Sequence, residues 1–175
     1  MLYINLLEFS GFSEIFEEAE SDIGDVIMRV REGNLKREVL SASIYATEGF
    51  SYIAPPVNPE SIIEITGEDI RKVLEWTIKE TDFEIIILDV GTNVKGFPNI
   101  VSICSKMYCL GKKGYLYEVQ MRQFLSYLER AVDETYLERI EQVELPGQIK
   151  VVCGGISLLE QLDWSEFGDF IRRKM

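Results

Sequence analysis

The chain has 175 residues, of which 46% are hydrophobic and 27% charged, a composition typical of a globular domain with a substantial core. Thirty acidic residues against 18 basic ones give a net charge of −12, which argues against binding to nucleic acid. The absence of histidine excludes Ser-His-Asp and Cys-His catalysis. The three cysteines lack C-x-x-C spacing, so they predict no zinc site. With no signal peptide or membrane-spanning run in view, a cytoplasmic protein is expected.

The first half of the chain predicts alternating strands and helices. An apolar run opens the sequence and is typical of a strand buried on both faces. The segment 39–45 is compatible with a short helix or a strand. Thr66 and Asp69 form a capping-box pattern at the start of a strongly periodic helix. The predicted elements are a strand at 1–7, a helix capped by Ser13, a helix at 21–32 that ends at Gly33, a strand at 50–54 and a helix at 66–79.

The second half continues the same alternation, which is the pattern of a mostly parallel sheet with helices on both faces. The sequence therefore predicts one domain over residues 1–175 with a three-layer α/β/α fold. The predicted elements are a strand at 83–90, a loop at 91–99, a strand at 106–111, a helix at 117–132, a short helix at 136–140, extended runs at 143–146 and 149–153, and helices at 157–162 and 165–173.

The strand Phe83–Val90 carries the most specific functional signal. It is apolar from Ile85 to Leu88 and then reaches Asp89, with Gly91 two residues further on. In nucleotide-binding α/β folds, an acid at the carboxyl end of a buried parallel strand lies where a hydrated Mg²⁺ and a phosphate are held. The alternative interpretation is a strand-end acid that caps the following loop. The phosphate-binding pattern G-x-x-x-x-G-K-[ST] does not occur in this sequence.

Several segments in order resemble the MinD/ParA group of P-loop ATPases. The opening strand is similar to the group's second strand, and the segment ending in Pro55-Pro56 is similar to the one before its long helix. The segment that contains Asp89 resembles the Walker B strand, residues 106–111 resemble the strand after it, and Val143–Pro146 resemble the late loop near the adenine. The closest subgroup is the TadZ/CpaE-like proteins, which place the machinery of Tad-type pili.

This resemblance implies a P-loop NTPase-like fold and a dimeric ATP-binding switch that positions a pilus, secretion or partitioning apparatus through protein partners. ATP and Mg²⁺ are the cofactors of the intact family member. Because the first strand and the Walker A loop have no counterpart here, we expect an N-terminally incomplete module that binds no nucleotide and has no ATPase activity alone. The alternatives are a non-catalytic scaffold of the same fold and a regulator resembling capsule tyrosine kinases, although a C-terminal tyrosine cluster is absent.

The resemblance assigns roles to four residues. Asp89 matches the Walker B acid that holds the water shell of Mg²⁺, and Gly91 matches the position that lets the backbone approach the γ-phosphate. Asn5 matches an aspartate at the end of the second strand, although an amide satisfied by the backbone is the favoured interpretation. Pro146 matches a loop position near the base. No catalytic residue is predicted.

The last predicted helix allows two interpretations. Its aromatic residues and the basic end Arg172–Lys174 would suit a helix that lies on a membrane surface. Four acidic residues between 160 and 169 oppose that interpretation. Packing of the helix against the domain is therefore favoured.

Overall fold

The computed structural model describes residues 1–11, 19–47, 49–146 and 158–174. The chain forms two compact units, one over Met1–Ile103 and the other over Cys104–Met175. The prediction of one domain that is incomplete at its N-terminus stays a prediction.

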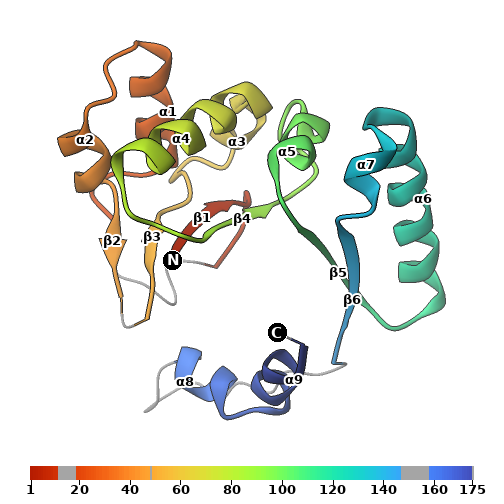
Figure 1. Ribbon diagram of the computed structural model, residues 1–175. Coiled ribbons are helices and arrows are strands. Elements are labelled where there is room, and N and C mark those ends of the chain that lie inside the picture. Colours follow the sequence, from red (N-terminus) through yellow and green to blue (C-terminus); the bar gives the residue numbers. More distant parts are fainter. Residues whose placement is uncertain (12–18, 48, 147–157, 175) are drawn as a thin grey trace. The chain divides into compact units, whose positions relative to one another are not determined.

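The first unit is organised around strand β1 (Leu2–Leu6), which lies inside a four-stranded sheet (Figure 1). Strands β3 (Ser51–Ile53) and β4 (Ile86–Val90) pair with its two edges, and both run parallel to it. Strand β2 (Tyr45–Ala46) pairs antiparallel with β3, so the strand order is β2-β3-β1-β4. The predicted α/β class with a mostly parallel sheet is confirmed.

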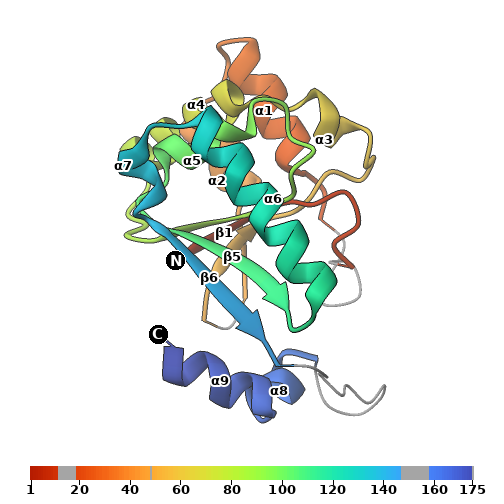
Figure 2. The same cartoon turned by 90° about the vertical axis from the view of Figure 1, so that its right-hand side faces the viewer.

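One face of this sheet carries the core of the first unit. Leu2 and Leu6 of β1 are fully buried, and so are Ile23 of helix α1 and Val73 of helix α4. Helices α1 and α4 lie on the same side of β1 in Figures 1 and 2. The helices of this unit are α1 (Ile23–Arg31), α2 (Arg37–Ala42), α3 (Ser61–Glu64), α4 (Gly67–Glu80) and α5 (Phe97–Ile103).

Helices α1 and α4 both begin at capping boxes. The Asp22 side chain accepts the amides of the first turn of α1 while Asp25 accepts the Asp22 amide. At α4, Thr66 and Asp69 exchange the same two hydrogen bonds. These side chains satisfy amides that have no partner within a helix, and they confirm the capping box predicted at Thr66.

The second unit contains a parallel pair of strands, β5 (Met107–Lys112) and β6 (Ile140–Leu145). Helix α6 (Tyr115–Ala131) follows β5 and packs on it, with a methyl group of Met121 close to Gly111. Leu128 is the fully buried residue of α6. The remaining helices are α7 (Glu134–Leu137), α8 (Leu158–Asp163) and α9 (Glu166–Lys174).

The structure corrects two predicted boundaries. The loop predicted at 91–99 ends earlier, because α5 begins at Phe97. The short helix predicted at 136–140 ends at Leu137, and strand β6 already begins at Ile140. The predicted cap at Ser13 and the predicted extended run 149–153 lie outside the described residues.

No helix in the described part of the chain combines the length and apolarity needed to cross a bilayer. Cys109 is buried as a free thiol. Membrane contact and packing against the domain both stay predictions for the last helix. Trp164, which precedes α9, is 84% exposed. The Arg172 side chain forms ion pairs with Asp163 and Asp169.

Candidate functional site

The candidate site lies at the carboxyl ends of β1 and β4. The parallel register places Asn5 directly beside Asp89. Strands of a parallel sheet end at a common edge, and ligands of open α/β sheets bind outside that edge. Two of the four residues predicted from the sequence are therefore neighbours in the sheet, and Gly91 follows directly after β4.

A chain of hydrogen bonds leads across this edge to Asp89. The amide of Leu7 donates to Asn5 Oδ1 at 2.9 Å, and Asn5 Nδ2 donates to the Tyr3 hydroxyl at 3.1 Å. The Tyr3 hydroxyl in turn donates to Asp89 Oδ2 at 2.6 Å. Each group both fixes and polarises the next one, so the Asp89 carboxylate is held in one orientation by a neutral donor.

Burial and the nearby carboxylate of Asp89 both raise the pKa of the Tyr3 phenol. Burial raises the pKa of the Tyr3 phenol well above its usual value of 10, and the hydrogen bond to Asp89 raises it further. The phenol therefore stays protonated at neutral pH and acts as a donor toward Asp89. Sequence reasoning missed Tyr3. The feature that could have identified Tyr3 is the alternation of side chains along β1, which places Tyr3 and Asn5 on the same face of the sheet.

The loops after the two strands complete the edge. Asn93 Nδ2 donates to Glu8 Oε1 and so joins the loop after β4 to the loop after β1. A Cβ atom added at Gly91 would lie 3.6 Å from Leu7 Cδ2 and 3.8 Å from Glu8 Oε2, which are ordinary contact distances. Packing within the protein therefore does not require glycine at position 91.

These residues suit a hard cation better than a phosphate. The donors at the edge are carboxylate and amide oxygens, the ligands that Mg²⁺ prefers, and Mg²⁺ is commonly held by one or two carboxylates together with water and phosphate oxygens. Among the described residues, no three acidic or thiol side chains cluster closely enough to enclose a metal by themselves. The sequence contains no G-x-x-x-x-G-K-[ST] loop, and the expectation that this chain binds no nucleotide by itself stays a prediction.

Pro146 follows the end of β6, in the second unit. Asn5, Asp89 and Gly91 all belong to the first unit. The prediction that Pro146 contributes near the base of the same nucleotide therefore stays a prediction.

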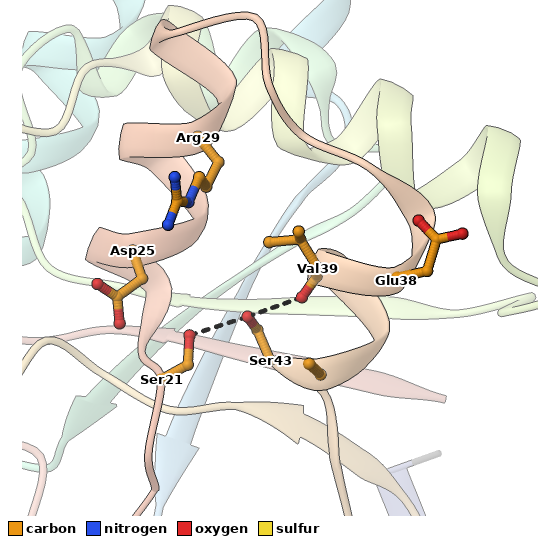
Figure 3. Close-up of a pocket in the computed structure, with 7 residues that line it drawn as sticks. Ser21, Asp25, Arg29, Glu38, Val39 and Ser43 are labelled. Atoms are coloured by element: carbon orange, nitrogen blue, oxygen red, sulfur yellow. Dashed lines mark hydrogen bonds between the residues drawn. The ribbon is translucent and has the colours of Figure 1, made fainter.

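A pocket of about 470 Å³ lies between α1 and α2, away from this edge (Figure 3). The hydroxyls of Ser21 and Ser43 are 2.9 Å apart, and Ser43 Oγ also donates to the Val39 carbonyl. Asp25 is engaged in the capping box of α1, and Arg29 pairs with Glu32. Because these polar groups already have hydrogen-bond or ion-pair partners within the fold, we do not assign this pocket as the site.

Comparisons with known proteins support the fold. No family model matches the chain, and no curated protein matches it. Among solved structures, the chain is similar to a ParA family ATPase from Chlorobium tepidum TLS, with a TM-score of 0.59 and 13% sequence identity. The match covers 83% of this chain and 60% of the other, so the chain spans about three fifths of that protein. The likeness shows that the chain has the α/β fold of a ParA family ATPase.

Proposed function

We propose that this chain is the metal-binding part of a MinD/ParA-like nucleotide switch. The observation that carries the proposal is the position of Asp89 beside Asn5 at the carboxyl edge of a parallel sheet. In this role the carboxylate of Asp89 orients the water shell of Mg²⁺, Asn5 and Tyr3 position Asp89, and the backbone at Gly91 approaches the terminal phosphate. ATP and Mg²⁺ are the ligands of the completed switch.

The wider role follows the resemblance to TadZ/CpaE-like proteins. We infer a dimeric switch that positions a pilus, secretion or partitioning apparatus through protein partners. Its fold similarity to a ParA family ATPase supports the coarse assignment. The net charge of −12 supports partners other than nucleic acid.

Because backbone amides and the lysine of a phosphate loop provide most triphosphate binding, the chain alone should neither bind nor hydrolyse ATP. A segment with a strand, a G-x-x-x-x-G-K-[ST] loop and a helix, co-expressed with the chain, should restore binding of ATP·Mg²⁺. Calorimetry would measure this binding. Asp89→Ala should weaken it at least tenfold in the presence of Mg²⁺.

A non-catalytic scaffold is the second candidate function. The hydrogen bond that Tyr3 donates to Asp89 favours it, because this contact gives the carboxylate a structural partner within the fold. The same calorimetry separates the two functions. A complex that forms with the loop segment but binds no ATP·Mg²⁺ would support the scaffold and contradict the switch.

A further inference from the structure

The Asp89 carboxylate has one oxygen engaged inside the fold and one oxygen that remains for a ligand. Its Oδ2 atom accepts the hydrogen bond from the Tyr3 hydroxyl at 2.6 Å. This length is typical of a hydrogen bond between a hydroxyl and a charged carboxylate, which is roughly twice as strong as a bond between neutral groups. No other described residue donates a hydrogen bond to Oδ1. The internal bond therefore leaves Asp89 with a single available oxygen.

Glu8, on the loop after β1, repeats this arrangement. Its Oε1 atom accepts a hydrogen bond from Asn93 Nδ2. Its Oε2 atom lies beside Gly91, at 3.8 Å from the position that a Cβ atom would take there, and Gly91 follows Asp89 by two residues. Both acidic residues of this edge thus have one oxygen held by a neutral donor of the chain, and both keep the other oxygen for a cation.

The number of available oxygens bears on the choice of cation. Ca²⁺ takes about six to eight oxygen ligands and readily binds both oxygens of one carboxylate. Mg²⁺ prefers an octahedral shell, keeps several of its waters and is held by one or two carboxylates. A carboxylate with one available oxygen can bind Mg²⁺, or a water of its shell, while the internal hydrogen bond stays in place. Bidentate binding of Ca²⁺ would break that bond.

We propose that Tyr3 and Asn93 are specificity-determining residues that make this edge select Mg²⁺ over Ca²⁺. Each of them holds one oxygen of an acidic residue and so prevents bidentate binding. Both side chains are neutral donors, so they limit the number of ligand oxygens without changing the charge of the site. The inference rests on the metal site of the proposed function and extends it, but it does not involve the nucleotide.

Heteronuclear NMR of the whole isotope-labelled chain measures the binding of each cation at this edge. The chain is titrated with magnesium chloride or calcium chloride at constant ionic strength. The amide resonances of Asp89 and Gly91 report on the site, and those at the acidic start of α7, Asp133 and Glu134, report on unspecific binding to surface carboxylates. In the wild-type chain, the resonances of the site should saturate at a lower concentration of Mg²⁺ than of Ca²⁺.

Two variants each free one carboxylate oxygen. Tyr3→Phe should tighten the binding of Ca²⁺ about tenfold, which is the weight of one hydrogen bond to a charged group. Asn93→Ala should tighten it about threefold, because water competes for this exposed hydrogen bond. Neither variant should change the binding of Mg²⁺ by more than about twofold. The same spectra show that each variant keeps its fold.

Tyr45→Phe is the matched control for the loss of a phenol. Strand β2, which carries Tyr45, lies at the opposite end of the sheet from β4, and the Tyr45 hydroxyl accepts the amide of Ser21 at 2.9 Å. The control should leave the dissociation constants of both cations unchanged. Asp89→Asn removes the charged ligand, and in this variant the shifts at Gly91 should disappear for both cations.

The outcomes separate this inference from the proposed function. Equal changes for both cations in Tyr3→Phe and Asn93→Ala, or a wild-type site that prefers Ca²⁺, would overturn the inference and leave the metal site in place. No local shift at Asp89 with either cation would contradict the metal site and the inference together. The expected change in selectivity, combined with no binding of ATP·Mg²⁺ by the completed complex, would support the inference and contradict the nucleotide switch.

Discussion

Asp69 gives the sharpest test of how the first unit is held together. Its Oδ2 accepts from Thr66 and from Arg31 Nη2 at 2.7 Å, while Oδ1 accepts from Arg31 Nε at 3.0 Å. One carboxylate therefore caps α4 and ties it to α1. In Asp69→Asn, the NH₂ group of the amide would face the donors of Arg31 or Thr66. The Arg31 guanidinium would also lose the negative charge with which it pairs.

The magnitude follows from the pKa of Asp69. Hydrogen bonds from Arg31 are the main reason that the pKa of this carboxyl falls from 3.8 to about 2. At about 1.4 kcal/mol for each pKa unit, the difference corresponds to roughly 2.5 kcal/mol of stability. The Arg31 side chain is 45% exposed, and solvent screening reduces the expected contribution to about 1–2 kcal/mol.

The sign of the pH dependence is fixed by this lowered pKa. The contribution of Asp69 is complete above its unfolded pKa, near 4, and is lost as the pH falls toward 2. Asp69→Asn should therefore lower the free energy of unfolding by about 1–2 kcal/mol at pH 7, and the difference from the wild type should shrink between about pH 4 and pH 2.

Urea unfolding followed by the fluorescence of Trp76 measures this difference. Trp76 lies on α4, and a Trp164→Phe background removes the signal of the other tryptophan. Glu75→Gln is the control, because Glu75 pairs with Arg71 on the exposed face of the same helix and should cost less than about 0.5 kcal/mol. A loss for Asp69→Asn that equals the control, or that is the same at pH 7 and pH 3, would refute the reasoning.

Three further predictions concern individual residues. Gly67→Ala should destabilise the first unit by about 1–3 kcal/mol in urea unfolding, because an added Cβ would lie 2.7 Å from a backbone carbonyl oxygen, whereas Gly91→Ala should cost less than about 0.5 kcal/mol. Tyr3→Phe should leave the rise in tyrosinate absorbance of the folded protein at about pH 10 unchanged, because the raised pKa keeps the Tyr3 phenol protonated there. A smaller rise in the variant would count against the buried hydrogen bond. Leu128→Ala should cost about 2–4 kcal/mol and speed amide exchange in the second unit, and unchanged exchange would contradict its place in the core.

Local patterns predicted those elements whose determinants lie within a few residues. The capping box at Thr66 and Asp69 is three residues long, so its spacing alone indicated the start of α4. The ion pair between Asp69 and Arg31 spans 38 positions and left no sequence signal. For the same reason, local sequence patterns predicted β1 and β4 as strands but not the contact from Tyr3 to Asp89, which joins residues 86 positions apart.

Residues 39–45 show why one segment was ambiguous. Helix α2 ends at Ala42, and the Ser43 hydroxyl then donates to the Val39 carbonyl. Strand β2 begins at Tyr45, whose ring stacks on Tyr52 of β3 with centroids 5.6 Å apart. The helix is set by local hydrogen bonds and the strand by a distant aromatic partner, so a single periodicity does not describe the segment.

Two carboxylates of the first unit, Asp69 and Asp89, differ in a way that bears on function. Asp69 is paired with the cation of Arg31, so its charge is neutralised within the fold. Asp89 is held by the phenol of Tyr3, which orients a carboxylate without neutralising it, and no lysine or arginine of the described chain forms an ion pair with it. An oriented, uncompensated carboxylate at the open end of a parallel sheet attracts positive charge from outside the chain. In the proposed switch that charge is supplied by Mg²⁺.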